Sequence, residues 1–364
     1  MRGHRALVVV LLIGCNDAPS TADADAGSED ASTAASGTTQ SSSESTASSG
    51  GAATTQGDGT SDGSSGGAGE SESSSSGGEP VPCDAAANTP GGPDPFGGCW
   101  PSELSTGIPP GTMLGDYDGS CTVTENDLVI DAMTVTCDPL IIRAANVQIT
   151  RSKIEGSVLV EAPMMGWSFT ITDSEIDAGP VQGTDDDSGI GKSDFVALRV
   201  NVYGGKRGVW CEYACSVTDS WIHDQSPDPS GMAHESAVRM GDGSTIAHNS
   251  ILCNAPDFPP DAGCSADLTG YGDFAPIQNN TIHRNLFMAT TGGACAYGGS
   301  SGDDGSKPYG DQAANIVFEE NVFQRGRGGN CGFYFPITDF DSTRPGNEWI
   351  ANVWDDGEPL PPAN

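Results

Sequence analysis

The chain has 364 residues, with 15 Lys and Arg against 50 Asp and Glu, and its formal net charge is −35 at pH 7. Nucleic acid and anionic membrane surfaces require concentrated positive charge, so the composition argues against both as partners. An anionic polysaccharide is not excluded, because a local basic groove can coexist with an acidic whole. The length allows more than one domain, and the composition along the chain indicates which parts fold.

Residues 1–14 are typical of an export signal. Arg2 and Arg5 precede an apolar run from Ala6 to Ile13 that is too short to span a bilayer as a permanent helix. The run ends in "LIGC", which resembles the bacterial lipoprotein signal, in which the cysteine, here Cys15, becomes the lipidated N-terminus. We expect an exported protein that contacts the membrane only through this lipid, at the outer membrane or cell surface. An ordinary secretory signal is the alternative.

The segment that follows has the composition of a flexible tether. Residues 16–80 are mostly Ser, Thr, Gly, Ala and acidic residues, with no aromatic residue and no Lys or Arg. Such a segment has too little apolar surface to offset the entropy of ordering. We therefore expect a tether over residues 15–80, a cap region over 81–120 and the folded domain over 121–364.

The cysteines indicate disulfides. Without Cys15 ten remain, and an even number in an exported chain is typical of a disulfide framework. Their spacing matches no zinc site, so we expect no metal there. Closeness in sequence suggests four pairs: Cys83–Cys99, Cys121–Cys137, Cys211–Cys215 and Cys253–Cys264. The first two would fasten a cap over the open end of the sheets.

A short pattern recurs through the folded part: an apolar residue, two polar residues, Ser or Asn, any residue, then an apolar residue. Copies include "ITRSKI", "ITDSEI", "VTDSWI" and "FEENVF". The fourth position of the copies falls at Ser152, Ser174, Val200, Ser220, Ser250, Asn285, Asn321 and Asn352. The intervals of 20 to 36 residues between these anchors indicate a stacked repeat architecture.

The residues between the anchors favour strands, being rich in Val, Ile, Thr and Phe and broken by Gly, Asn and Asp. Each repeat holds two or three short strand segments separated by bends. Stacked coils of this kind bury one side of every strand and pair each rung with its neighbours. The pattern predicts an all-β right-handed parallel β-helix, a single-stranded solenoid with long inter-rung loops, whose anchors lie at the bend between the second and third strands.

The repeated "I-T-x-S-x-I" rung, the opening "VIDAMTVTCDPLIIRAANVQITRSKIEG" and the long loops between late rungs carry a family resemblance. Over roughly residues 105–355 the chain resembles the pectate-lyase-like right-handed β-helix superfamily, and more closely the exported bacterial right-handed β-helix repeat proteins. The resemblance is specific for the fold. It is weak for activity, because this architecture hosts lyases, hydrolases, epimerases, adhesins and phage parts.

The register of the anchors predicts two further relationships. Cys295 and Cys331 each lie ten residues after an anchor, so they fall on neighbouring strands and form a fifth expected disulfide. His248 and His283 each lie two residues before an anchor, which gives them the same place on consecutive coils. Because Thr150, Thr172 and Thr218 hold that place on earlier coils, we interpret His248 as scaffold rather than as a catalytic residue.

The resemblance implies a substrate groove along the sheet of first strands, which we expect in stretches such as "SGIGKS", "RGVWCEY", "ESAVRMG", "DFAPIQ" and "ACAYGG". The middle rungs hold the richest mixture of acids, bases and aromatic residues. The candidate catalytic residues are Lys192, Glu212, His234, Glu235 and Arg239. The candidate substrate-binding residues are Arg207, Trp210, Tyr271, Asp273 and Tyr297.

Two chemistries fit these residues. A lyase of uronic-acid polymers needs a group that neutralises the carboxylate and a base for the C5 proton, which Arg239, Lys192 and His234 offer, with Tyr271 or Tyr297 as the acid. A glycoside hydrolase needs two carboxyl groups, for example Glu212 with Glu235 or Asp273. A non-catalytic carbohydrate-binding or adhesion protein, a structural envelope protein, and ordinary solvated surface residues are the alternatives.

We expect a polysaccharide partner and no cofactor, and the sequence leaves the oligomeric state open. Two acidic stretches, Asp185 to Asp187 and Asp303 to Asp304, offer the clustered oxygen ligands that calcium prefers. Neither matches a defined calcium loop, and we interpret both as solvated turns.

Overall fold

The structure is a computed structural model that describes residues 82–181, 187–302 and 304–362. Every described residue belongs to one compact unit, Pro80–Asn364. The expected signal segment, Cys15 and the whole of the expected tether lie outside the described residues, as do Asp185, Asp186 and Asp303. In the described part, no helix is long and apolar enough to cross a membrane, and the single helical element is a 3-10 turn at Gly310–Gln312.

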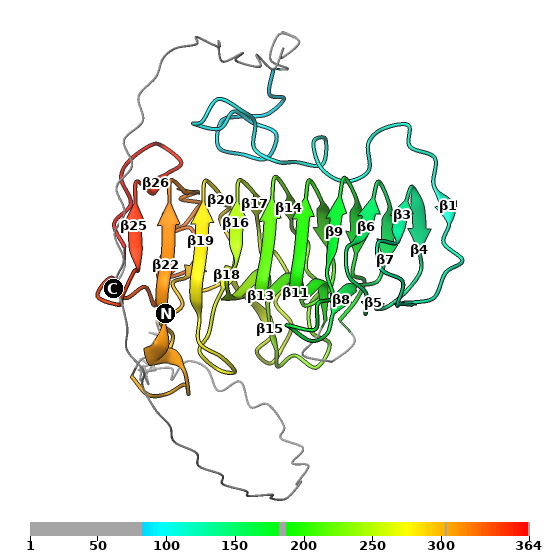
Figure 1. Cartoon of the computed structure of the whole chain (residues 1–364). Coiled ribbons are helices and arrows are strands. Elements are labelled where there is room, and N and C mark those ends of the chain that lie inside the picture. Colours follow the sequence, from blue (N-terminus) through cyan, green and yellow to red (C-terminus); the bar gives the residue numbers. More distant parts are fainter. Residues whose placement is uncertain (1–81, 182–186, 303, 363–364) are drawn as a thin grey trace, which may run out of the picture. The chain divides into compact units, whose positions relative to one another are not determined.

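The described chain winds through successive coils, and strands at the same place on neighbouring coils pair in parallel (Figure 1). We number the three faces of this solenoid in the order in which the chain passes them. The first face contains β2 (Thr122–Val123), β5 (Leu140–Ile142), β8 (Val158–Val160), β11 (Ser188–Leu198), β13 (Arg207–Thr218), β15 (His234–Asp242), β18 (Gly263–Thr269), β21 (Ala294–Tyr297) and β24 (Phe335–Thr338).

The other two faces continue each coil. The second face contains the later halves of β11 and β13 together with β3 (Val129–Asp131), β6 (Val147–Thr150), β9 (Phe169–Thr172), β16 (Thr245–Ala247), β19 (Gln278–His283), β22 (Ala314–Glu319) and β25 (Glu348–Ile350). The third face contains β1 (Gly115–Asp116), β4 (Met133–Val135), β7 (Lys153–Glu155), β10 (Glu175–Asp177), β12 (Asn201–Tyr203), β14 (Trp221–Ile222), β17 (Ser250–Ile251), β20 (Leu286–Phe287), β23 (Val322–Phe323) and β26 (Val353–Trp354).

The structure is thus an all-β parallel solenoid, as the repeat predicts. Its core is built from aliphatic and aromatic residues that stack from coil to coil. On the second face Ile149 pairs in register with Ile171, and both are fully buried. On the third face the buried rings of Phe287 and Phe323 stack with centroids 4.6 Å apart. Each coil buries its inward residues only against its neighbours, which is why the pattern must recur to form a core.

The polar anchors lie at the bend between the second and third faces, with one correction of register. Asn249, and not Ser250, is the equivalent of Asn285, because Ala247 pairs with His283 while Ser250 pairs with Leu286. From Asn249 onward four buried asparagines form a ladder in which each side-chain NH₂ donates to the next Oδ1, at 3.0 Å for Asn249 to Asn285. The ladder continues through Asn321 to Asn352 at 3.0 and 2.8 Å.

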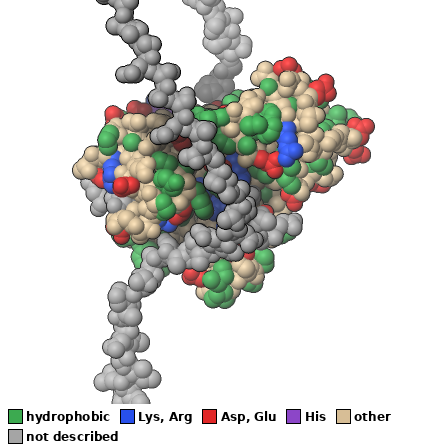
Figure 2. Space-filling model, turned by 60° about the horizontal axis from the view of Figure 1, so that its bottom comes forward, with side chains coloured by type: hydrophobic (Ala, Val, Ile, Leu, Met, Phe, Trp, Pro, Cys, Tyr) green, Lys and Arg blue, Asp and Glu red, His purple; other side chains and the backbone are tan. Residues whose placement is uncertain are grey.

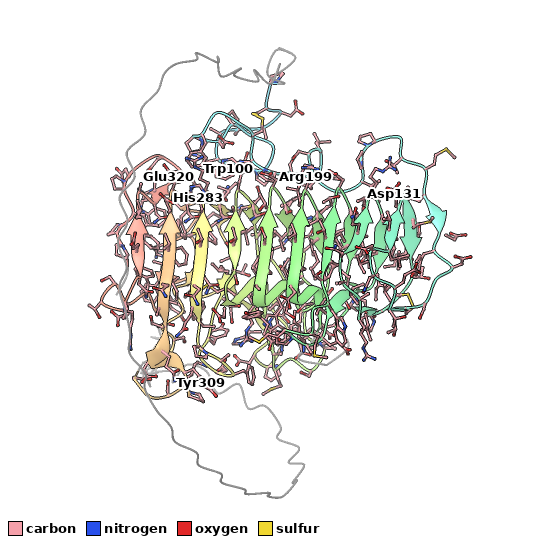
Figure 3. The ribbon with its side chains drawn as sticks, viewed as in Figure 1. Trp100, Asp131, Arg199, His283, Tyr309 and Glu320 are labelled. Atoms are coloured by element: carbon pink, nitrogen blue, oxygen red, sulfur yellow. A yellow bond between two sulfur atoms is a disulfide. The ribbon has the colours of Figure 1, made fainter. Side chains whose placement is uncertain are left out.

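The residue before each anchor has a left-handed backbone, with φ between 47° and 54°, from Ala132 to Ala351. Several of these residues carry charge and pair with a neighbouring coil. Arg199 donates to Asp173 at 2.6 Å, and Arg284 donates to Glu320 at 2.7 Å. Figure 3 shows Asp131, Arg199, His283 and Glu320 along this one edge of the solenoid. His248 also occupies the left-handed position, so it is equivalent to Arg284, and the predicted equivalence of His248 with His283 is wrong.

Residues 83–112 form a strap along the same edge (Figure 1). Gly107 donates its N–H to Arg199 O at 2.9 Å, Ser250 Oγ donates to Pro101 O at 2.7 Å, and Asn88 Nδ2 donates to Asp355 O at 2.8 Å. These contacts reach from the middle coils to the last one. The strap therefore does not cover an open end of the sheets, as the sequence-based interpretation had it, but follows the turns lengthwise.

His248 holds the strap to the coils. Its ring stacks on the buried Trp100 with centroids 5.5 Å apart, and its nitrogens contact Asp219 Oδ1 at 2.6 Å and Asp94 Oδ2 at 3.1 Å. Burial alone would lower the pKa of His248, but the two carboxylates outweigh it and raise that pKa above its ordinary value. The structure thus gives His248 a fastening role.

Five disulfides staple the described chain: Cys83–Cys99, Cys121–Cys137, Cys211–Cys215, Cys253–Cys264 and Cys295–Cys331. These are the five pairs expected from the sequence. The last joins neighbouring coils and spans 36 residues, whereas the others close loops of 4 to 16 residues. Disulfides in this number suggest an oxidising, extracellular environment.

Candidate functional site

The first face carries an outward row of side chains across its middle coils. Trp210 on β13 lies opposite Arg239 on β15, and Arg239 lies opposite Thr269 on β18. These residues point out of the core because the inward positions beside them are taken by Val209, Val238 and Leu268, which are fully buried. A large aromatic ring and a guanidinium thus lie side by side on a sheet surface.

Three cations surround the ring of Trp210. The distances from its centroid are 5.0 Å to Lys192 Nζ, 5.4 Å to the guanidinium carbon of Arg207 and 5.3 Å to that of Arg239. They come from three different strands, β11, β13 and β15, which the coil register brings together. Figure 2 turns the lower side of Figure 1 forward and shows Lys and Arg side chains near the middle of that side, next to hydrophobic ones.

Arg239 connects this group to a second aromatic group. Its guanidinium carbon lies 5.3 Å from the ring centroid of Tyr271 and 5.6 Å from that of Phe274. The rings of Tyr271 and Tyr297 meet edge to face at 4.9 Å. Because Tyr297 lies one coil beyond Thr269, the aromatic surface extends along the solenoid axis over several coils. We call Lys192, Arg207, Trp210, Arg239 and Tyr271 the cation–aromatic cluster.

One carboxylate borders the cluster and is shared between two cations. Asp273 Oδ1 accepts from Lys307 Nζ at 2.7 Å, and Asp273 Oδ2 lies 3.5 Å from Arg239 Nη2. Lys307 also lies 5.1 Å from the ring centroid of Tyr271. Tyr309, in the loop that carries Lys307, lies on the side of the solenoid opposite the strap (Figure 3). Lys307 carries no signal in the sequence, since nothing in an irregular loop 34 residues after Asp273 indicates that the loop folds back onto it.

The stretch "DFAPIQ" is not a first strand. Residues 273–277 form an irregular connection between β18 and β19, and the first strand of that coil is β18, with the sequence "GCSADLT". The Cys253–Cys264 disulfide fastens the beginning of β18. Asp273 still reaches the cluster, but from the turn that follows the strand.

Glu235 does not face the cluster as an open carboxylate. It lies four residues before Arg239 on β15, about 13 Å along the strand, and its side chain is fully buried. One oxygen accepts the N–H of Asp228 at 2.7 Å, and the other has no hydrogen-bond partner among the described residues. Burial raises the pKa of Glu235 to about 7 against the opposing effect of that N–H.

His234 and Glu212 also stand apart from the ring of cations. His234 Nε2 contacts Asp261 O at 2.8 Å and borders a separate hollow of about 370 Å³ beside Phe258 and Pro260. Glu212 lies two residues beyond Trp210 on β13 and therefore on the same side of the strand. Of the ten candidate residues, seven gather within or beside the cluster, and His234, Glu235 and Glu212 do not join its contacts.

A second buried carboxylate lies on the same face and carries no signal in the sequence. Asp267 on β18 is fully buried, and its Oδ1 accepts the N–H of Cys253 at 2.6 Å. Burial raises its pKa well above the ordinary value, against the opposing effect of that N–H. Asp267 lies close to Cys295 and Cys331, but both sulfurs are used in their disulfide, so this group does not offer thiolate ligands to a metal.

The arrangement favours recognition of an anion over hydrolysis by paired carboxylates. Trp210 and Tyr271 offer ring faces, and four cations surround them with Asp273 as the neighbouring counter-charge. A hydrolase needs two carboxyl groups across one bond, whereas here Glu235 is buried and Asp273 is held by Lys307 and Arg239.

Comparison with known proteins adds no relative: no family model, no curated protein and no solved structure matches this chain.

Proposed function

We propose that this protein binds an anionic polysaccharide rich in uronic acid on the first face of its solenoid. The observation that carries the proposal is the placement of Lys192, Arg207 and Arg239 around the ring of Trp210 in a chain of net charge −35. The ring supplies a flat apolar partner for the C–H face of a sugar, and the cations supply partners for its carboxylates.

We make two further proposals, one on the handedness of the solenoid and one on the location of the protein. We propose a right-handed winding, as in the pectate-lyase-like superfamily, because crossovers between parallel strands of one sheet are right-handed in about 98% of cases. We also propose lipid anchoring through Cys15 at the bacterial cell envelope, with residues 15–80 as the tether. The five disulfides support export to an oxidising compartment.

The chemistry that suits this cluster is β-elimination. Arg239 and Arg207 would hold the carboxylate of a uronate, which acidifies its C5 proton, and Lys192, once it has released its own proton to solvent, would take that proton. The C4–O4 bond then breaks, the C4–C5 double bond forms, and the Tyr271 hydroxyl gives its proton to the leaving O4. Cations stabilise the enolate-like charge that develops on the carboxylate in the transition state. The chemistry needs no cofactor.

Non-catalytic binding is the second candidate function, and a specific observation favours it. Arg239 and Lys307 already share Asp273, which lowers the net positive charge available to polarise a bound carboxylate. A protein of this kind would hold polysaccharide at the cell surface without cleaving it.

The deciding experiment measures binding and cleavage on the same polymers. Calorimetry with polygalacturonate, alginate and chondroitin sulfate should show binding that weakens as salt rises. Trp210→Ala should weaken it at least tenfold, while Glu212→Gln, on the same side of the same strand, serves as the matched control. Ultraviolet absorbance of unsaturated products that disappears with Lys192→Met supports the lyase. Binding without products supports the second candidate, and the absence of binding to all three polymers would falsify both.

A further inference from the structure

A separate hollow of about 400 Å³ lies on the second face, which Figure 1 views from the front. Its floor is formed by outward residues of β6, β9 and β11, which are Gln148, Thr150, Thr170, Thr172 and Val196. The volume falls in the range of about 300–1,000 Å³ that is typical of small-molecule sites. The three strands span about 10 Å, which leaves room for a short stretch of sugar chain.

The hollow has a local structural cause. At this corner most coils turn from the first to the second face through a left-handed residue, such as Asn146 and Asp194, with φ of 61° and 52°. The coil between those two instead leaves through residues 161–168, which connect β8 to β9. Asn146 and Asp194 therefore project on either side of a coil whose corner is displaced, and both line the hollow.

The floor carries no charge, although the chain has 50 acidic residues. The side chains of Gln148, Thr170 and Thr172 make no hydrogen bond to another described residue, so their donors and acceptors face the hollow or solvent. Val196 is 42% exposed and adds an apolar surface among the hydroxyl groups. Such a mixture of amide, hydroxyl and methyl groups matches the alternating hydroxyl and C–H surfaces of a sugar.

One wall holds an acceptor that no described residue uses. Asp194 Oδ2 is buried from solvent and has no hydrogen-bond partner in the described part of the chain. A carboxylate oxygen only accepts, so its natural partner is a hydroxyl donor. A sugar hydroxyl placed in the hollow would satisfy it with a charge-assisted hydrogen bond.

We propose that this hollow is a second saccharide site that takes an uncharged sugar. It differs in chemistry from the cation–aromatic cluster, because it contains no cation and one carboxylate, which repels uronates. The inference rests on the second face alone and holds whether or not the first face binds polyanions. If both sites operate, the preferred polymer has neutral as well as anionic sugars.

The test uses the full chain and calorimetry with neutral hexasaccharides of glucose, xylose and mannose. Thr170→Arg fills the hollow and should weaken neutral-sugar binding at least tenfold. Thr245→Arg is the matched control, because Thr245 lies in the same outward row three strands further along and outside the hollow. Asp194→Asn, which removes the charge from the acceptor, should weaken binding severalfold. Thermal melting confirms that each variant folds.

The result that overturns the inference is the absence of binding to every neutral hexasaccharide, or binding that Thr170→Arg leaves unchanged. Tighter binding of a glucosamine oligomer that depends on Asp194 would also overturn it, since the hollow would then recognise an ammonium group. Binding of polygalacturonate reports separately on the first face. It should be unchanged in Thr170→Arg, and Trp210→Ala should leave neutral-sugar binding intact.

Discussion

Arg239 lies directly opposite Trp210 on the neighbouring strand, with its guanidinium carbon 5.3 Å from the centroid of the indole ring. The same guanidinium lies 5.3 Å from the ring centroid of Tyr271, and Arg239 as a whole residue is only 6% exposed. A planar guanidinium can stack between rings and still present N–H groups to a carboxylate, whereas a compact ammonium cannot do both. The shape of the cation at this position therefore matters as well as its charge.

This geometry predicts that Arg239→Lys weakens polyanion binding severalfold although the charge is kept. Cation–π contacts contribute about 0.5–2 kcal/mol each, and bidentate contact with the carboxylate is lost as well. Calorimetry with polygalacturonate measures the effect, and Lys192→Arg, which keeps a cation near the same ring, is the comparison. Equal affinity of the Arg239→Lys variant and the parent chain would show that charge alone governs recognition.

The raised pKa of the buried Glu235 carboxyl makes the stability of the fold depend on pH. Its pKa rises from 4.5 to about 7 on folding, so the folded state holds this proton more tightly than the unfolded chain. The contribution of Glu235 to the free energy of unfolding is therefore fully present below pH 4.5, and it is lost as the pH rises through about 7. The shift corresponds to about 3 kcal/mol at most.

Glu235→Gln keeps an oxygen for the N–H of Asp228 and removes the titration. Urea unfolding should therefore show a difference in stability between parent and variant that changes by up to about 3 kcal/mol in favour of the variant between pH 4 and pH 8. Asp267 also has a raised pKa, but it is present in both the parent chain and the variant. Its effect on stability therefore cancels in the difference between the two, which reports on Glu235 alone. Parallel stability curves at all pH values would contradict the prediction.

His248 predicts that the strap loosens at alkaline pH. The pKa of His248 is raised in the folded state, so its contribution to stability is fully present below the unfolded value of 6.5 and is lost as pH rises through the folded value. Its partner Asp94 stays ionised in this range, because the N–H groups of Gly98 and Phe96 and the His248 ring lower its pKa despite burial.

Limited proteolysis within residues 83–112 measures the strap directly. Cleavage of the parent chain should speed up from pH 6 to pH 9, and His248→Ala should be cleaved fast at both. His283→Ala is the control, since His283 lies on the same edge but its ring contacts Glu320, which is outside the strap. A pH-independent cleavage rate in the parent chain would show that Trp100 packing alone holds the strap.

Much of the fold is predictable from the sequence, because a solenoid repeats its requirements. The Ser and Asn anchors recur wherever a coil bends, and the equal phase of Cys295 and Cys331 relative to Asn285 and Asn321 places them on neighbouring coils. The anchor in "HNS" was misplaced because Asn249 and Ser250 are both short polar residues. A shift of one residue moves a side chain to the other side of the strand, so it also misplaced His248.

The candidate site was less predictable, for physical reasons. Arg207, Trp210 and Arg239 meet because strand register fixes them, and strands carry a recognisable pattern. Lys307 comes from an irregular loop, where no periodicity indicates the direction of the chain. The burial of Glu235 depends on the loop that contains Asp228, which alternation along β15 does not reveal.

The loop lengths of the disulfides predict which of them stabilises the fold most. In the chain-entropy model, removing Cys295–Cys331, which spans 36 residues, costs about 4 kcal/mol, while removing Cys211–Cys215, which spans 4, costs about 2 kcal/mol. Paired Cys→Ser variants compared by guanidinium unfolding give both values. Equal losses, or a larger loss for the short loop, would show that local strain or packing outweighs loop entropy.

The asparagine ladder predicts a large loss from one small substitution. Asn285 donates to Ile246 O at 2.7 Å and to Asn321 Oδ1 at 3.0 Å, and its Oδ1 accepts from Asn249. Asn285→Ala removes these bonds and leaves buried partners unpaired, which costs about 1–3 kcal/mol for each stranded group. We expect a loss of several kcal/mol in urea unfolding, against less than about 0.5 kcal/mol for the exposed Thr281→Ala nearby. A loss below 1 kcal/mol would mean that water enters the turn and replaces the amide, and the ladder would then be a consequence of stacking rather than one of its causes.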